Sequence, residues 1–116
     1  MDQDTVSDWL LRTGDTNPIH TDKAYATEHG FRDIVVPGAL ITSVFTGMIE
    51  RWKDADEMIS GLSITHKKIT YINDTLSFLA EIKSNDHDET VIEIEALDEN
   101  EAVVASGEIK LTKIAL

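Results

Sequence analysis

The spacing of apolar residues changes from a helical period to a strand period near Gly61, and this change limits the folds open to the chain. Before Gly61, apolar side chains recur at the spacing of helices that bury one face. Beyond Gly61, apolar and polar residues alternate, most clearly over residues 91–95. We therefore predict an α+β fold in which helices come first and strands follow.

Three helices are expected in the first half of the chain. The first covers residues 4–13 and ends at Gly14, a residue type that favours the left-handed turn at a helix end. The second covers residues 23–29 and begins after Asp22, whose carboxylate suits the N-cap position. The third covers residues 39–52 and carries apolar side chains on more than one face, which predicts a helix buried on most sides.

Four strands are expected in the second half, with polar turns between them. Consecutive strands joined by hairpins, after one long buried helix, predict an antiparallel sheet wrapped around that helix. The length of 116 residues is that of one domain, covering residues 1–116, with no room for a second core. The expected strands cover residues 62–72, 76–83, 90–97 and 102–112.

The charge balance is strongly acidic, with 10 Lys and Arg residues against 22 Asp and Glu and a formal net charge of −12. Such a surface repels phosphate backbones and anionic lipid, so we expect no nucleic-acid or membrane partner. The chain has no cysteine, which excludes a disulfide, a thiolate nucleophile and a cysteine-ligated zinc ion. The acidic N-terminus lacks the basic start of a secretory signal, and the expected location is the cytoplasm.

A polar loop over residues 13–22 carries the side chains most suited to chemistry. Asp15 and His20 lie five residues apart on it, and Pro18 restricts Asn17 to an extended backbone. A carboxylate and an imidazole that converge on one water molecule can exchange a proton with it near neutral pH. The residues alone leave a second interpretation open, in which Asp15 accepts hydrogen bonds from turn amides and His20 only packs or caps.

This loop resembles the Gly-Asp-x-Asn-Pro-x-His-x-Asp signature of the MaoC-like, R-specific enoyl-CoA hydratases, a family of the hot-dog superfold. Every fixed position of the signature is present, and the resemblance extends over residues 10–49 and, more weakly, through the strands. The matching residues are Gly14, Asp15, Asn17, Pro18, His20 and Asp22.

The resemblance implies a fold, a reaction and a set of site residues. The fold is a hot-dog domain, and the reaction is the reversible hydration of trans-2-enoyl-CoA to (R)-3-hydroxyacyl-CoA. Asp15 and His20 are expected to hold and activate the water, and the backbone N–H of Gly38 to stabilise the charge that forms on the thioester oxygen. No cofactor is implied beyond coenzyme A, which is part of the substrate. The alternative for Gly38 is a turn glycine that follows Pro37.

Three supporting residues have two interpretations each. Thr46 matches a helix serine of some relatives, and Ser43 lies one turn earlier. Either hydroxyl could bond to Asp15, or each could bond back to its own helix backbone. Asn17 either shapes the loop alone or also orients His20.

No metal site is expected, because the one conceivable pair of ligands, His20 and Asp22, has no third candidate nearby in the sequence. The remaining histidines are scattered along the chain and are given no role. They are His29, His66 and His87.

The sequence departs from the family pattern at three places. Relatives usually have a strand before the first helix, and here that helix begins almost at residue 1, so the sheet either lacks one strand or has its edge covered by a partner chain. The residue before Gly38 is often histidine in relatives and is Pro37 here, which removes a donor. The family segment that shapes the acyl pocket corresponds here to residues 69–74 and differs in sequence.

Two other functions stay open on the same fold: thioester hydrolysis, and a non-catalytic subunit that binds an acyl thioester or assembles with another chain. An isologous homodimer, or a higher oligomer of such dimers, is the expected assembly. Acyl-CoA is the expected substrate, because acyl carrier proteins are commonly acidic and would be repelled by this chain. The phosphates of coenzyme A need a basic patch, for which the candidates are Arg51, Lys53, Lys67 and Lys68.

Overall fold

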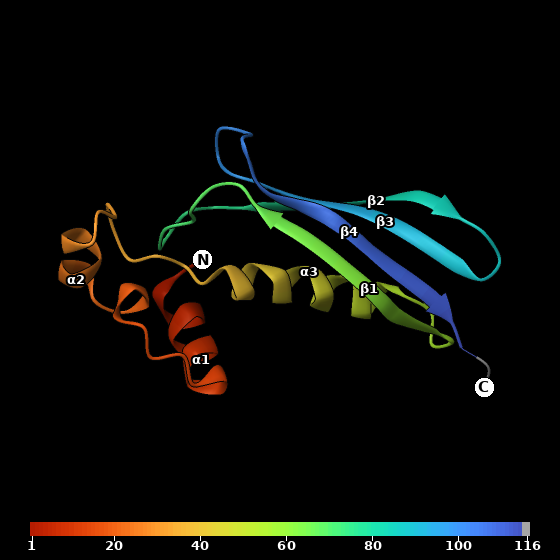
Figure 1. Cartoon of the computed structure of the whole chain (residues 1–116), viewed down its shortest axis with the longest axis horizontal. Helices are drawn as coiled ribbons and strands as arrows, with labels where there is room; N and C mark the ends of the chain where they lie inside the picture. The colour runs from red at the N-terminus through yellow and green to blue at the C-terminus, as the bar shows by residue number, and fades with distance from the viewer. Residues whose placement is uncertain (115–116) are drawn as a thin grey trace.

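The computed structural model describes residues 1–114, and in it the helices occupy one end of an elongated molecule and the sheet the other (Figure 1). The longest helix, α3, runs beneath the sheet and links the two ends. The elements in chain order are α1 (Gln3–Thr13), the 3₁₀ helix η1 (Pro18–His20), α2 (Lys23–Glu28), α3 (Gly38–Trp52), β1 (Glu57–His66), β2 (Ser77–Asn85), β3 (Glu89–Leu97) and β4 (Val103–Lys113).

The ends of the two N-terminal helices follow the local signals in the sequence. Asp2 caps α1, where its Oδ1 accepts a hydrogen bond from the N–H of Thr5 at 2.8 Å, and this bond lowers the pKa of Asp2. Gly14 ends the helix in the left-handed conformation, with φ 72°. Asp22 caps α2 by accepting from the N–H of Tyr25 at 3.1 Å, as predicted.

The four strands form one antiparallel sheet in the order β1-β4-β3-β2. The prediction of a strand over residues 62–72 was wrong at both ends, because β1 covers Glu57–His66. The ladder stops where the N–H groups of Lys67 and Lys68 both donate to the carbonyl of Val104, at 2.8 and 3.2 Å. Residues 70–72 form no strand of the sheet: Tyr71 makes an isolated bridge with Val35, and the backbone around it bonds to residues 34–36.

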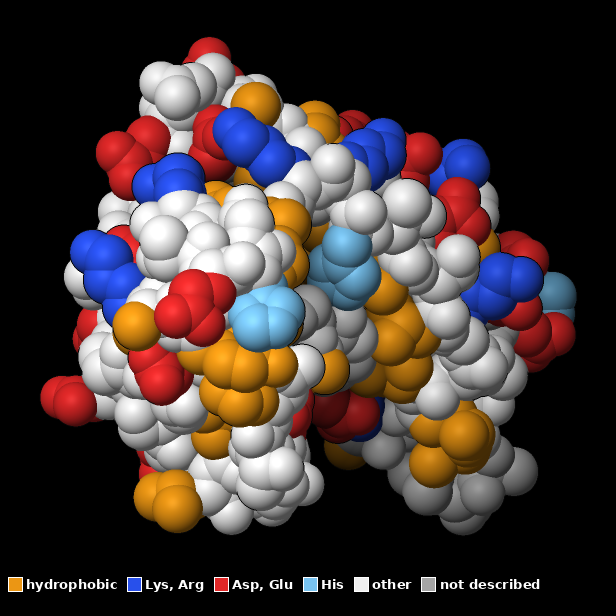
Figure 2. Space-filling view, turned by 60° about the vertical axis from the view of Figure 1, so that its left-hand side comes forward, with side chains coloured by type: hydrophobic (Ala, Val, Ile, Leu, Met, Phe, Trp, Pro, Cys, Tyr) orange, Lys and Arg blue, Asp and Glu red, His pale blue; other side chains and the backbone are white. Residues whose placement is uncertain are grey.

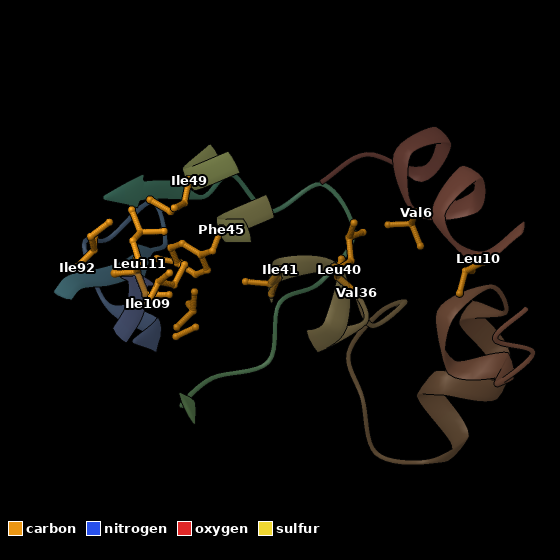
Figure 3. Close-up of a cluster of buried hydrophobic side chains, with 14 residues drawn as sticks. Val6, Leu10, Val36, Leu40, Ile41, Phe45, Ile49, Ile92, Ile109 and Leu111 are labelled. Carbon is orange, nitrogen blue, oxygen red and sulfur yellow. The ribbon is translucent and has the colours of Figure 1, made fainter. Parts of the chain in front are cut away.

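The core lies between α3 and one face of the sheet. Phe45 and Ile49 point from the helix toward Ile92, Ile109 and Leu111 on β3 and β4 (Figure 3). All five side chains are at most 2% exposed, so they form the most deeply buried part of the fold. The expectation of a sheet over one long apolar helix is confirmed, and together these elements have the architecture of a hot-dog domain.

The helix is buried along one stripe rather than on most sides, so this part of the prediction was wrong. Val44 and Met48 are only half-buried, and Trp52 is 56% exposed. A single four-stranded sheet covers only one side of a helix, and within residues 1–114 nothing else covers the opposite side of the C-terminal half of α3.

The outer face of the sheet carries acidic side chains. Glu93 on β3 lies directly opposite Glu108 on β4, a pairing of like charges that is unfavourable by itself. Lys83 of β2 offsets it, since its Nζ lies 2.7 Å from Glu108 and 3.7 Å from Glu93. The ion pair with Glu108 raises the pKa of Lys83 and lowers that of Glu108.

Both edges of the sheet are unpaired within the described residues, and no strand precedes α1 there. The β2 edge is the more exposed, with Leu79 at 49% and Ile82 at 47%. Among residues 1–114, no helix combines the length and the apolar character that crossing a membrane requires.

Candidate active site

The loop between α1 and α2 is held by side-chain hydrogen bonds to its own backbone. Asp15 Oδ1 accepts from the N–H of Asn17 at 3.0 Å, and Asn17 Oδ1 accepts from the N–H of Ile19 at 3.2 Å. The second bond caps η1, which begins at Pro18. Asn17 therefore shapes the loop, and in the described structure its side chain makes no hydrogen bond with the ring of His20.

The ring of His20 is buried and points at a carbonyl from a distant part of the chain. Its Nδ1 lies 2.7 Å from the backbone oxygen of Val35, and the residue is 8% exposed. A carbonyl oxygen only accepts hydrogen bonds, so Nδ1 carries the proton and the neutral ring keeps a lone pair on Nε2. The N–H of Val35 donates to the carbonyl of Ile19 at 2.9 Å, so the two segments hold each other at two points.

Asp15 faces the free nitrogen of this ring. Its Oδ2 lies 3.5 Å from Nε2 of His20, and its side chain is 36% exposed against 10% for the histidine. In the neutral ring both atoms are acceptors, and at this separation they can each accept one hydrogen from the same water molecule. The predicted acid and imidazole therefore come together, with one buried and one open to solvent.

Gly38 is the first residue of α3, directly after Pro37. No side chain caps this helix, so its first N–H groups are available to a ligand and carry the positive end of the helix dipole. Gly38 lines a pocket of about 290 Å³, and Val35 and Val36 form part of the same wall. The segment that orients His20 thus also borders the pocket at Gly38.

The hydroxyl groups of Ser43 and Thr46 both bond to the backbone of their own helix. Ser43 Oγ donates to the carbonyl of Leu40 at 2.7 Å, and Thr46 Oγ1 donates to the carbonyl of Ser43 at 3.1 Å. Each bond is the return to the helix backbone that serines and threonines often make. Of the two alternatives for these residues, the structure has the bond to the helix backbone and not the bond to Asp15.

The pocket at Gly38 is also lined by two residues for which the sequence indicates no role. They are His66, at the end of β1, and the buried Thr70. The alternating pattern of β1 could have pointed to the first, because it places His66 on the same face as Ile64 and Leu62, the face that covers α3. Two histidine side chains lie close together on the face shown in Figure 2, beside hydrophobic side chains.

The four basic candidates do not form one patch. Lys67 and Lys68 line the pocket at Gly38, and Lys68 pairs with Asp98 at 2.6 Å. Arg51 belongs to the last turn of α3, which the helical rise places roughly 20 Å from the first turn. Lys53 follows that turn and pairs with Glu50 at 3.4 Å. Only the first pair is positioned to meet a ligand in the pocket.

The loop, the buried histidine and the helix terminus lie on a hot-dog fold. The protein is therefore of the hot-dog class. The chain matches the MaoC like domain family over residues 1–104, and it therefore belongs to that family. No group of three or more histidine, cysteine or acidic side chains with the geometry of a metal site is present in the described part of the chain.

One curated protein and two solved structures show what the chain is similar to individually. An (R)-specific enoyl-CoA hydratase from Aeromonas caviae is 28% identical over 98 residues, which is 84% of this chain and 65% of that protein. The chain thus spans just under two thirds of that relative's length. The structure of an (R)-hydratase from A. caviae has a TM-score of 0.87 at 20% identity, covering 98% of this chain and 89% of that one. A chain of the ChsH1–ChsH2 complex from Mycobacterium tuberculosis has a TM-score of 0.87 at 18% identity. The match covers 97% of this chain and 88% of that one.

Proposed function

We propose that this protein hydrates trans-2-enoyl-CoA to (R)-3-hydroxyacyl-CoA and catalyses the reverse dehydration. The observation that carries the proposal is the pair formed by Asp15 and His20, in which Oδ2 and Nε2 lie 3.5 Å apart. The A. caviae relative with this activity supports the choice of reaction. Lys67 and Lys68 beside Gly38 support coenzyme A as the carrier, because its phosphates need nearby cations.

The reaction begins with a water molecule that donates one hydrogen to Oδ2 of Asp15 and the other to Nε2 of His20. As its oxygen attacks the β-carbon, Nε2 takes the proton, and the imidazolium that forms is stabilised by the Asp15 carboxylate and by the Nδ1 bond to Val35. The electron pair of the double bond moves toward the thioester, whose oxygen becomes an enolate. Protonation of the α-carbon by Nε2–H completes the addition of one water.

The enolate oxygen needs hydrogen-bond donors that are already in place before the charge develops. The N–H of Gly38 is such a donor, at the uncapped start of a 15-residue helix. The missing side chain lets a thioester approach the backbone closely.

The test is the hydration of crotonyl-CoA by purified protein, followed at the absorbance of the conjugated thioester. Asp15→Asn and His20→Ala should each lower kcat/KM by about 100-fold or more, the usual scale for loss of an acid or base. His87→Ala is the matched control, because that ring is 90% exposed in a distant turn. Near-normal rates in both site variants would show that the assignment is wrong. Release of free coenzyme A would instead indicate a thioesterase.

A second candidate is a subunit that binds an acyl thioester without converting it, or that works only beside another chain. Two observations favour it: the unpaired edge of β2 and a solved relative that is itself a complex of two proteins. Tight binding of butyryl-CoA with no turnover of crotonyl-CoA would support this candidate over the hydratase.

We further propose that the protein is a homodimer or an oligomer of dimers. The exposed apolar side chains of Trp52 and Ile82 border a groove of about 400 Å³ between α3 and β2, and Leu79 is exposed on the same strand. Burial of this surface against a second copy favours association. Light scattering coupled to size exclusion should give twice the chain mass, and a monomer at micromolar concentration would contradict the proposal.

A further inference from the structure

The ring of His66 lies over the first turn of α3. A Cβ atom placed on Gly38 would lie 3.4 Å from both Cε1 and Nε2 of that ring. One turn further along the helix, Thr42 Oγ1 lies 3.5 Å from Nε2, which is at the limit of a hydrogen bond. The ring of His66 is thus close enough to touch a Cβ atom at position 38, and its Nε2 makes only this one long contact with a polar side chain.

The pocket that His66 and Gly38 share differs from the rest of this acidic protein. Its wall is built from valines and isoleucines together with His66, Thr70, Lys67 and Lys68. No acidic side chain lines it, although the chain has 22 of them. Asp98 pairs with Lys68 at 2.6 Å and offsets its charge, so Lys67 is the lysine of the wall that favours a ligand group with negative charge.

Thr70 is a further polar residue in the wall of this pocket. The residue is 2% exposed, and its Oγ1 is the one buried side-chain polar atom without a hydrogen-bond partner among the described residues. Leaving a buried hydroxyl unpaired is unfavourable, so such groups usually have a function.

We propose that His66 is a further catalytic residue of the hydration reaction. Its Nε2–H donates a hydrogen bond to the thioester carbonyl oxygen of the substrate, beside the N–H of Gly38, and stabilises the enolate together with it. The inference rests on the proposed function, and it assigns a different task from that of His20. His20 moves protons, whereas His66 keeps its proton and stabilises charge.

The kinetic test compares three substitutions at position 66. His66→Ala should lower kcat for crotonyl-CoA by about 100-fold, as loss of one oxyanion donor does, with KM changed far less. His66→Phe fills the space over Gly38 but has no donor, and it should be as slow as His66→Ala. His66→Gln keeps an N–H donor and should recover to within about tenfold of the unsubstituted protein. If alanine prevents folding, the glutamine and phenylalanine variants decide. Equal kcat in those two variants would overturn the inference.

A binding measurement separates this inference from the proposed function. Butyryl-CoA labelled with ¹³C at its carbonyl cannot be hydrated, and the infrared stretch of that carbonyl reports the hydrogen bonds it accepts. Binding should move the band to lower frequency, and the shift should be smaller in His66→Phe. If crotonyl-CoA is not turned over but the shift is present, the hydratase proposal fails and the thioester site at His66 stands. An equal shift in both proteins, or no binding at all, overturns the role of His66.

Discussion

Nδ1 of His20 lies 2.7 Å from the carbonyl oxygen of Val35, fifteen residues further along the chain. This one contact sets which nitrogen of the His20 ring is protonated, and so it decides that Nε2 faces Asp15 as an acceptor. The carbonyl belongs to the segment that leads into α3 and Gly38. The ring of His20 and the proposed thioester site are therefore held by the same stretch of backbone.

The first prediction concerns this tautomer. In protein labelled with ¹⁵N at histidine, at about pH 8 where histidines are ordinarily neutral, His20 should show a protonated Nδ1 and an unprotonated Nε2. The exposed ring of His87 is the internal comparison, because no buried acceptor selects its tautomer. Multiple-bond ¹H–¹⁵N correlation spectra distinguish the two forms, and a protonated Nε2 on His20 would contradict the proposed role as base.

The second prediction concerns the carrier. Lys67 lines the pocket at Gly38, so Lys67→Ala should raise KM for crotonyl-CoA by about tenfold, the effect of losing one charge-assisted hydrogen bond. Lys53→Ala is the matched control, since that lysine lies beyond the far end of α3 and pairs with Glu50. The effect of Lys67→Ala should shrink in high salt, where the attraction to phosphate is screened. Equal KM values in the two variants would show that Lys67 does not contribute to binding of the coenzyme A carrier.

The third prediction concerns the packing of β1 against β4. A Cβ atom on Gly107 would lie 1.8 Å from the carbonyl oxygen of Ser63 and 2.8 Å from Cα of Ile64, both backbone atoms that cannot turn aside. Gly107→Ala should therefore lower the free energy of unfolding by about 3 kcal/mol or more. On the partner strand, a Cβ atom at Gly61 would meet only the side chain of Lys110, at 3.5 Å. Gly61→Ala should therefore change the free energy of unfolding by less than about 1 kcal/mol. Urea denaturation measures both, and similar midpoints would contradict the prediction.

The fourth prediction concerns acid stability. Hydrogen bonds from Lys68 and from the N–H groups of Ala102 and Asn100 lower the pKa of Asp98 below its ordinary value of 3.8. The folded state therefore binds this proton less readily than the unfolded chain does. The stability that the carboxylate contributes is present above the ordinary pKa and is lost as the pH falls through the lower, folded value. Asp98→Asn should make the unfolding free energy fall less steeply with decreasing pH below about pH 4. Chemical denaturation across that range measures the slope, and an unchanged slope would argue against this contribution.

Features that depend on near neighbours could be predicted from the sequence. Asp22 caps α2 through a bond that spans three residues, and Gly14 ends α1 through its own backbone freedom. The loop that carries Asp15 and His20 belongs to the same class, because Asn17 and Pro18 shape it locally. Ser43 and Thr46 also follow this rule, since each bonds to a carbonyl three residues back.

Features that depend on contacts between distant parts of the chain could not be predicted from the sequence. The end of β1 was misplaced because residues 70–72 read as a strand but find their backbone partners at residues 34–36. The alternation of β1 places His66 on the face that covers α3, but only the packing of the strand on the helix brings its ring to Gly38. The exposure of Trp52 depends likewise on how much of α3 the sheet covers.

The sequence by itself determined the order of helices and strands, the caps of the N-terminal helices and the loop that presents an acid and an imidazole. Those features rest on backbone preferences and on hydrogen bonds that span a few residues. Only the tertiary structure decided the tautomer of His20, the residue that lies over Gly38 and the pair of lysines at the pocket. These features depend on which distant segments pack together. Packing must fill the core and give the buried polar groups hydrogen-bond partners over the whole fold, so no short stretch of sequence decides it.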